Sequence, residues 1–272
     1  MKLSEKYYNE KLKFQLELSE FAQSLGDKIS KEGEWNIKGF VDIFKNIYTI
    51  SSDTKVISKI LELHLFPYFT EFAEITNYHL ELPKYQNYYP DITFINKKDN
   101  KIKFAVDLKT TYLNQKRQGY CNGFTLGSHG EYFINRESSK NIHYPYNQYV
   151  AHFCFGIIYN RVFLTSEFEA KNYSVDDIEN IPSVINNFIF FAQEKWKIAS
   201  DKRGSGNTAN IGSIKKVDDI LVGNGIFSEF GEDIFNDYWI NYGKIQIETE
   251  EGTRKTMTSL NEYISYRGIS HG

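Results

Sequence analysis

The 272-residue sequence predicts one α/β domain, because helix-period and strand-period apolar patterns follow one another without a clear linker or internal repeat. Residues 1–30 and 51–66 carry helical patterns, and residues 92–112 and 149–164 carry strand patterns. The composition, 41% hydrophobic and 25% charged, is that of an ordinary globular chain. It argues against disorder, and the length allows a substantial core.

The helical patterns come first along the chain. Residues 12–25 repeat Leu and Phe at helical spacing and predict an amino-terminal helix, although residues 12–18 also alternate. A second helix is predicted after the capping cluster Ser51, Ser52 and Asp53. Its expected apolar face is Val56, Ile60 and Leu63, and its expected polar stripe is Lys55, Lys59 and Glu62. Pro67 and Pro83 punctuate the stretch that follows.

A β-hairpin is predicted next, from DITFIN and KIKFAVDLKTTY separated by the turn-like KKDN. Side chains alternate along a strand, so the two faces of the second strand can be assigned. The expected core face is Ile102, Phe104, Val106 and Leu108, and the opposite face is Lys103, Ala105, Asp107, Lys109 and Thr111.

The rest of the chain is less regular. Residues 121–130 are Gly-rich and loop-like, and residues 149–164 are typical of buried strands. The apolar run of residues 184–199 fits either a helix or a strand. Residues 203–213, RGSGNTANIGS, predict a loop.

The hairpin carries the best candidate for catalysis. If its strands pair, Asp91 lies beside Asp107, with Lys109 on the same face. Two carboxylates around one point suit Mg²⁺, and a neighbouring ammonium can orient a water or stabilise a phosphate oxygen, which together hydrolyse a phosphodiester. The Asp-x-Lys spacing alone is common, since Asp53 and Asp99 also begin one. A hairpin surface with ordinary salt bridges therefore stays an alternative.

Glu62 and the Gly-containing loop each allow two interpretations. Glu62 fits a solvated helix face as well as a third carboxylate turned towards the metal. The loop GSGNT fits a plain surface loop as well as one whose backbone and Asn207 read base edges. The loop lacks the dinucleotide-binding and P-loop patterns. Elsewhere in the sequence, the six His show no metal-ligand spacing, and no G-x-S-x-G nucleophile elbow occurs.

The charge distribution suits a polyanion. The net charge of the chain is −3, but the charges are unevenly distributed. Residues 84–118 carry eight Lys or Arg and three Asp, a balance of +5, and residues 193–216 carry six Lys or Arg and two Asp or Glu, a balance of +4. The remainder of the chain therefore carries −12. Seven acids and one Lys lie in residues 228–252. Two Cys without paired spacing, no leader signal and no membrane-length apolar run predict a cytoplasmic protein that does not enter membranes.

Several longer segments resemble the EcoRV family of type II restriction endonucleases, within the PD-(D/E)XK nuclease superfamily. The segments occur in the family's order, from about Gly39 to Gly268. They are SDTKV from Ser52, PKYQNYYPD from Pro83, DLKTTY from Asp107, FTLG from Phe124, KNIHYP from Lys140, GSGNTANIGSI from Gly204, GIF from Gly225 and DYWINY from Asp237. The resemblance implies a restriction-endonuclease-like α/β fold, a mixed central β-sheet flanked by helices, as one domain over residues 1–272. Residues 1–35 would form a helical extension without a clear family counterpart.

The resemblance also implies roles for individual residues. Asp91, Asp107 and Lys109 match the catalytic residues, and Glu62 matches an auxiliary acidic one. Asp91, Asp107, the Leu108 carbonyl and Glu62 would be metal ligands. The residues implied in DNA binding are Gly204, Ser205, Gly206, Asn207, Thr208 and Ala209 in the major groove, Gln86 and Asn87 at the minor groove, and Thr54, Lys55, Thr110, Thr111 and Tyr112 at backbone phosphates.

The implied activity is Mg²⁺-dependent hydrolysis of duplex DNA by a homodimer, with Mn²⁺ as a substitute ion. The implied site is the palindrome GATATC, cut bluntly at its centre. A cognate DNA methyltransferase is expected in the host, without binding this protein. Departures from the family are Ala209 in the recognition loop, Tyr85 and Tyr88 around Gln86, Ile240 at a basic position, and a longer segment at residues 113–123.

Two other functions stay open at this point. One is a catalytically idle DNA-binding protein of the same fold, against which the intact Asp91, Asp107 and Lys109 argue. The other is a nuclease of this fold with a different specificity, which would cut independently of the palindrome.

Overall fold

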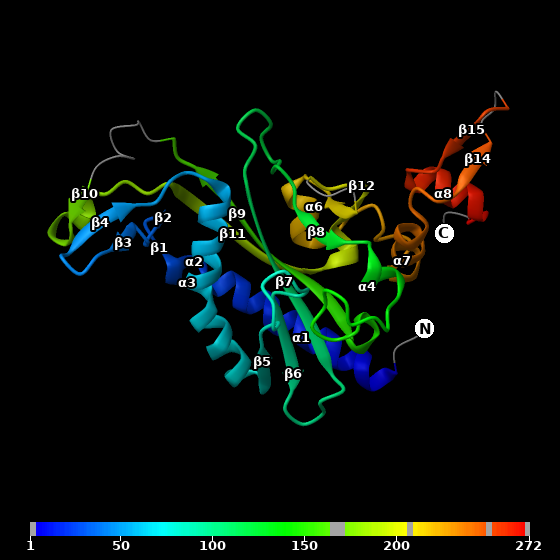
Figure 1. The fold of residues 1–272 in the computed structure, drawn as a ribbon, viewed down its shortest axis with the longest axis horizontal. Helices are drawn as coiled ribbons and strands as arrows, with labels where there is room; N and C mark the ends of the chain where they lie inside the picture. Colours follow the sequence, from blue (N-terminus) through cyan, green and yellow to red (C-terminus); the bar gives the residue numbers. More distant parts are fainter. Residues whose placement is uncertain (1–3, 164–171, 206–208, 249–251, 270–272) are drawn as a thin grey trace.

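A seven-stranded mixed β-sheet forms the centre of the computed structural model, which describes residues 4–163, 172–205, 209–248 and 252–269 (Figure 1). Its strand order is β1-β2-β11-β9-β7-β6-β5, with β7 and β9 parallel and the other pairs antiparallel. The helices are α1 (Glu5–Ser24), α2 (Gly26–Ile29), α3 (Thr54–Ile75), α4 (Glu131–Ile134), α6 (Val217–Val222), α7 (Glu232–Asn241) and α8 (Leu260–Arg267), with 3₁₀ turns η1 (Tyr146–Gln148), η2 (Val175–Asn180) and η3 (Lys195–Ile198). The strands of the central sheet are β1 (Ser30–Lys31), β2 (Glu34–Trp35), β5 (Tyr78–Glu81), β6 (Ile92–Asn96), β7 (Lys103–Tyr112), β9 (Ala151–Arg161) and β11 (Ile185–Glu194). This is the predicted mixed sheet flanked by helices.

Three small sheets complete the fold of the residues that the structure describes. They are β3 (Gly39–Val41) and β4 (Asn46–Thr49) with β10 (Asn172–Ser174); β8 (Thr125–Ser128) with β12 (Ala199–Arg203) and β13 (Asn210–Ser213); and β14 (Gln246–Glu248) with β15 (Arg254–Thr256). Figure 1 shows the β3–β4–β10 sheet at one end of the long axis and α7, α8 and β14–β15 at the other. The β8–β12–β13 sheet lies between these ends, and Gly204 and Ser205 directly follow its strand β12.

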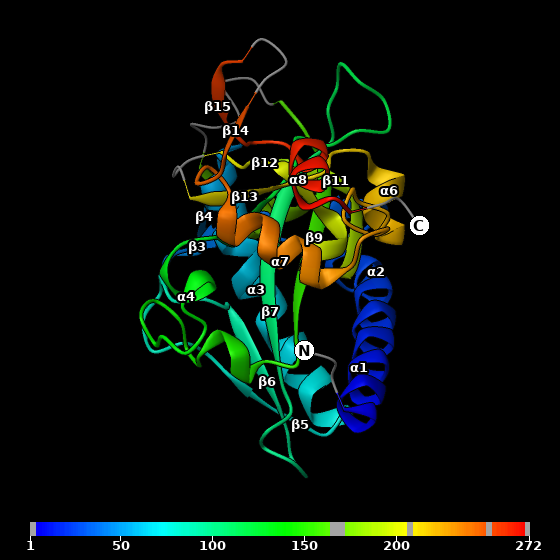
Figure 2. The ribbon, with the colours of Figure 1, turned by 90° about the vertical axis from the view of Figure 1, so that its right-hand side faces the viewer.

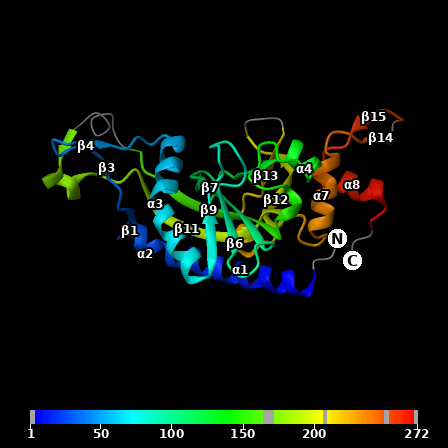
Figure 3. The same cartoon turned by 60° about the horizontal axis from the view of Figure 1, so that its bottom comes forward.

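Hydrophobic clusters cover both faces of the central sheet. On one face, Phe14 of α1 stacks on Phe104 of β7 with ring centroids 4.2 Å apart, and Phe69 of α3 packs in the same cluster. Figure 3 shows α1 running along this side of the sheet. On the other face, Ala105 of β7 belongs to a second cluster with Trp239 of α7. Figure 2 shows α7 and α1 as separate layers about the strands. The strand that carries Asp107 is therefore central and covered on both sides.

The amino-terminal segment is part of the main core. Phe14 and Leu18 are fully buried, and the Lys11 ammonium lies 2.9 Å from the buried Glu194 carboxylate at the end of β11. Burial is the largest effect and would raise the pKa of Glu194, but the charges of Lys11 and Lys197 and the hydrogen bonds from Lys11 and Trp196 together outweigh it and lower the pKa. A buried pair that loses one partner leaves an uncompensated charge, so α1 is tied to the sheet at this point.

The second predicted helix forms, but with a different buried face and a later end. Asp53 caps α3 by accepting hydrogen bonds from the backbone N–H groups of Lys55 and Val56, as the sequence predicted. The buried face is Ile57, Ile60, Leu61 and Leu65, whereas the expected Val56 and Leu63 are exposed. The helix also continues through Pro67 to Ile75.

Other local expectations have mixed outcomes. Residues 184–199 resolve as strand β11 followed by a 3₁₀ turn, and residues 121–130, expected as a loop, contain strand β8. In the predicted first helix, Phe14 and Leu18 are buried but Leu12 and Leu16 are exposed. Among the described residues no helix combines the length and apolar character that a membrane crossing requires.

Candidate active site on the β6–β7 hairpin

Asp91, directly before β6, and Asp107, on β7, belong to one hairpin. In the antiparallel register Ile92 pairs with Val106, so Asp91, one residue before, faces Asp107, one residue after. The Asp91 Oδ2 accepts a hydrogen bond of 2.7 Å from the Leu108 backbone N–H, which fixes that carboxylate against β7. The structure therefore brings the two predicted carboxylates together as the hairpin pattern predicted.

Lys109 completes the cluster. Its Nζ lies 2.6 Å from Asp107 Oδ2 and 3.7 Å from Asp91 Oδ2, and it donates a hydrogen bond of 3.2 Å to the Leu108 carbonyl. Three oxygens from three residues thus converge on one cation. The Asp107 side chain is buried, which differs from the fully solvated ion pair that an ordinary hairpin surface would carry.

The surroundings of Asp91 and of Lys109 shift the pKa values of both groups. Burial, followed by the charge of Asp107, raises the pKa of Asp91 to about 7 against the opposing effect of Lys109. Burial would lower the pKa of Lys109, but the charges of Asp107 and Asp91 outweigh it, and the pKa is raised. Lys109 is therefore a protonated donor at neutral pH, and ionised Asp91 is held in an unfavourable site.

Asp91→Asn is expected to change how stability depends on pH. A carboxyl whose pKa is raised from 3.8 to about 7 on folding contributes stability below pH 4 that is lost as pH rises through 7. An Asn at this position does not ionise, so the variant loses no stability in this way as pH rises. Between pH 5 and pH 8, in chelator, the variant should gain about 1–2 kcal/mol of unfolding free energy relative to the original chain, a figure reduced because 36% of the Asp91 side chain is exposed. Urea unfolding at the two pH values measures this.

Asp99→Asn is the matched control, from the turn of the same hairpin. The Lys6 side chain lowers the pKa of Asp99, the opposite direction from Asp91. Removing this carboxylate should therefore cost stability as pH rises. Equal pH dependence in the two variants would contradict the environment described for Asp91.

The donor set fits a divalent metal ion. Carboxylate and backbone carbonyl oxygens are the hard ligands that Mg²⁺ prefers, and here Asp91, Asp107 and the Leu108 carbonyl already surround a cationic group. Within the described part of the chain, no group of three or more His, Cys, Asp or Glu is gathered closely enough to hold a metal. The carbonyl would therefore have to act with the two carboxylates.

Glu62 is not gathered with the two carboxylates. It lies on the exposed face of α3, where its Oε1 is 2.6 Å from the Lys59 ammonium. This is the solvated-face arrangement that its helical spacing allowed. Its role as an auxiliary acid stays a prediction.

The residues expected at backbone phosphates line one cleft. This cleft, about 520 Å³, is lined by Thr54, Lys55, Ser58, Lys109, Thr110, Thr111, Tyr112, Asn122, Gly123, Phe124, Thr125, Gly127, Tyr159 and Ser205. A hydrogen bond between Ser58 and Thr110 joins α3 to β7 at its wall. The cleft brings together the start of α3, the end of β7 and one end of the loop segment. Hereafter it is called the phosphate cleft.

A second cleft opens beside the carboxylates. It measures about 380 Å³ and is lined by Gln86, Asn87, Tyr88, Tyr89, Asp91, Asp107, Lys109, Gly127, Ser128, Glu131, Tyr132 and Asn141. The expected minor-groove residues Gln86 and Asn87 thus share a cleft with the catalytic candidates. Lys109 and Gly127 line both this carboxylate cleft and the phosphate cleft.

The ends of the predicted recognition loop are anchored to β8 and to His129, the residue directly after it. Thr125 Oγ1 donates a hydrogen bond of 3.4 Å to the Ser205 carbonyl, and the His129 N–H donates one of 2.8 Å to the Ala209 carbonyl. Gly204 continues the ladder by bonding to the Asn210 carbonyl. Gly206, Asn207 and Thr208 lie outside the described residues.

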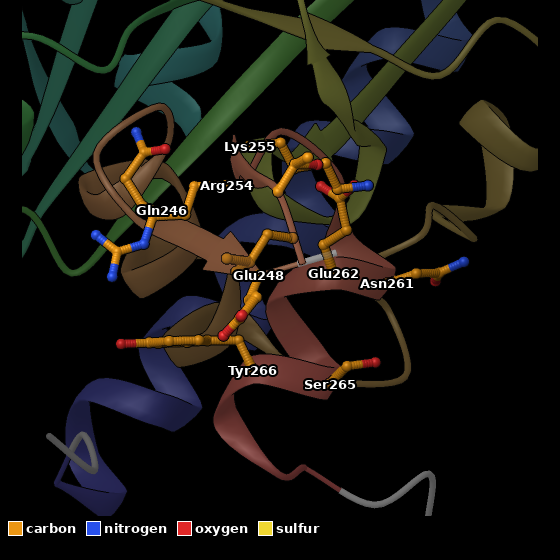
Figure 4. A pocket seen from close by; sticks show the side chains of 10 residues that line it. Gln246, Glu248, Arg254, Lys255, Asn261, Glu262, Ser265 and Tyr266 are labelled. Carbon is orange, nitrogen blue, oxygen red and sulfur yellow. The ribbon is translucent and has the colours of Figure 1, made fainter. Parts of the chain in front are cut away.

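A larger hollow, about 1130 Å³, lies away from this chemistry at the carboxyl-terminal hairpin (Figure 4). Its wall carries both signs of charge, and Lys255 pairs with Glu262 at 2.8 Å. It contains none of the predicted site residues. The volume of a hollow therefore does not select the candidate site, which is chosen by the convergence of oxygens on Lys109.

Sequence reasoning missed three residues near the site: Glu131, Tyr132 and Lys195. Glu131 and Tyr132 line the carboxylate cleft, and Lys195 lies beneath it. A Lys immediately after the buried strand β11 was the available signal for Lys195. Only the packing of β8 over η3 places that Lys under the cleft.

Comparison with known proteins agrees with this geometry. The family model described as "Restriction endonuclease EcoRV" matches residues 31–268. The type II restriction enzyme EcoRV of Escherichia coli is 38% identical over 253 residues, which cover 92% of this chain and 98% of that protein.

Proposed function

Because the chain belongs to the EcoRV restriction endonuclease family, a family of DNA hydrolases, we propose that it cuts duplex DNA at GATATC, bluntly and at the centre. The proposal adds Mg²⁺ as the cofactor, with Mn²⁺ as a substitute, and a homodimer as the active form. The observation that carries the chemistry is the convergence of Asp91, Asp107 and the Leu108 carbonyl on the Lys109 ammonium.

In the proposed mechanism Asp91, Asp107 and the Leu108 carbonyl would hold the metal ion. When bound, such an ion neutralises charge on the scissile phosphate and lowers the pKa of a water. Lys109 stays protonated because of the two carboxylates, so it donates to a phosphate oxygen and holds the reacting groups in line. The buried position of Asp107 keeps bulk water from screening these charges.

The two clefts supply the proposed DNA contacts. Lys55, Thr110 and Thr111 in the phosphate cleft would position the backbone without reading sequence. Gln86 and Asn87 would approach the minor groove, and the segment from Gly204 to Ala209 would read the major groove. The anchoring of Ser205 to β8 and of Ala209 to His129 supports this assignment, because a reading loop needs fixed ends.

A second copy of the chain is the proposed partner. A palindrome presents two equivalent half-sites, which a twofold dimer can read with one loop each. The β3–β4 hairpin, at one end of the molecule in Figure 1, carries the exposed apolar side chains Phe40, Val41, Ile43, Phe44 and Tyr48. Asp42 Oδ1 accepts hydrogen bonds from the Phe44 and Asn46 N–H groups, so the tip is rigid. This rigid apolar tip is the proposed dimer contact.

Digestion of a plasmid with one GATATC site tests the specificity. In Mg²⁺ the protein is expected to give one linear product, and sequencing its ends should place both breaks at the centre. A matched plasmid carrying GATTTC should stay uncut. Cutting of both plasmids would replace GATATC by another specificity, and binding without cutting in every divalent ion would favour an idle DNA-binding protein.

A further inference from the structure

Lys195 is a buried cation that the mechanism above does not use. It begins η3, directly after β11, and 4% of it is exposed. Its ammonium faces the rings of Tyr89 and Phe133, each 5.4 Å from Nζ to the ring centroid. Within the residues that the structure describes, Nζ has no hydrogen-bond partner. A buried ammonium without an acceptor is unfavourable for folding, since ring faces replace only part of its hydration.

The ammonium lies directly under the floor of the active site. A Cβ added to Gly127 would lie 3.4 Å from Lys195 Nζ and 3.6 Å from Tyr132 Oη. Gly127 lines both the phosphate cleft and the carboxylate cleft, and its φ of +88° belongs to the region that glycine tolerates. Because Gly127 has no side chain, none lies between the Lys195 ammonium and the two clefts at this point.

The charges around Lys195 link it to the proposed metal ligands. Burial, together with the charges of Lys109 and Arg136, lowers the pKa of Lys195 to about 8, while the charge of Asp107 acts in the raising direction. Lys195 is therefore still mainly protonated at pH 7. Glu194, the preceding residue, is occupied by Lys11 and Lys197. Glu194 is therefore not a free partner for Lys195, whose ammonium lies beneath Gly127 in the wall of the cleft that Asp91 and Asp107 also line.

We propose that Lys195 is a positioning residue that acts through its charge and makes metal binding depend on DNA. The Lys109 ammonium already balances part of the negative charge of Asp91 and Asp107. Lys195 adds a second fixed positive charge beneath Gly127, so binding of a divalent cation is unfavourable when no phosphate is present. A DNA phosphate in the cleft supplies the missing negative charge. The same ammonium then stabilises charge that develops on the phosphate. This inference rests on the proposed metal site.

The test is a titration of the DNA-free protein with Mg²⁺ alone, at pH 7, by isothermal titration calorimetry. Lys195→Met removes the charge and keeps an apolar side chain of similar length. Its half-saturating Mg²⁺ concentration is expected to fall on the order of tenfold, while its single-turnover cleavage rate at saturating Mg²⁺ falls about tenfold. A merely structural Lys195 would not tighten metal binding, so an unchanged or weaker affinity in a folded Lys195→Met protein overturns the proposal.

Three variants keep the result interpretable. Lys195→Arg retains the charge and should bind Mg²⁺ as the original chain does. Lys197→Met removes one charge from the same 3₁₀ turn, where Lys197 Nζ pairs with Glu194 at 3.3 Å, and should leave Mg²⁺ affinity unchanged. If Lys195→Met does not give a cooperative thermal transition, Lys195→Gln takes its place under the same criteria.

Asp107→Asn separates failure of this inference from failure of the proposed function. If Asp107→Asn leaves Mg²⁺ binding intact, the assigned metal site is wrong. If Asp107→Asn removes binding and Lys195→Met does not change it, only the role of Lys195 is overturned.

Discussion

Asp107→Ala is expected to lower DNA cleavage by at least about a thousandfold while leaving a folded protein. The carboxylate lies 2.6 Å from the Lys109 ammonium and faces Asp91 across the hairpin, so its loss removes one proposed metal ligand and the main partner of Lys109. Folding should survive because β7 is fixed by apolar neighbours on both sides, Phe104 and Val106 on one and Ala105 on the other. Single-turnover cleavage of a GATATC duplex in Mg²⁺ measures the loss, and circular dichroism reports the fold.

Asp99→Ala is the control for this experiment. Asp99 begins the same Asp-x-Lys spacing in the same hairpin, but it pairs with Lys6 at the exposed turn. It should cleave at nearly the original rate. Substantial cleavage by Asp107→Ala would remove Asp107 from the chemistry, whatever the control shows.

Replacing both Ile43 and Phe44 by Asp is expected to convert the proposed dimer into monomers and to lower duplex cleavage at nanomolar protein by about a hundredfold or more. The exposed fractions are 91% for Ile43 and 78% for Phe44, values that favour burial by a partner. In a twofold interface each substitution acts twice, so four carboxylates would be placed in the apolar contact. Light scattering after size exclusion gives the mass of each species.

The control is Ile75→Asp, because Ile75 is 77% exposed at the end of α3 and outside the β3–β4 hairpin. This variant should remain a dimer with full activity. A dimer that persists in the Ile43 and Phe44 double variant would place the interface elsewhere, and a monomeric, fully active original chain would refute the homodimer.

Much of the site could be predicted because its geometry is local. A hairpin with a short turn fixes its own register, so the placement of Asp91 opposite Asp107 follows from chain positions alone. Strand alternation then puts Lys109 on the face of Asp107. The cap at Asp53 was predictable for the same reason, since it depends on residues two and three positions away.

Features that depend on distant segments were missed or assigned wrongly. On α3 the expected face contained Val56 and Leu63, but the sheet that packs on this helix buries Ile57 and Leu61 instead. Pro67 was expected to interrupt, yet α3 continues to Ile75, because packing of Phe69 and Phe72 in the core outweighs one lost backbone hydrogen bond.

The sequence by itself determined the hairpin, its two facing carboxylates and the accompanying lysine, because these depend on period-two alternation and a short turn. Only the tertiary structure decided that Asp107 on β7 is buried, that Gln86 and Lys55 flank the same lysine in two clefts, and that Lys195 lies beneath Gly127. The physical reason is that burial and charge act through space. The layer formed by β8, β13 and α7 covers β7 from segments far along the chain, and no local pattern specifies where that layer packs.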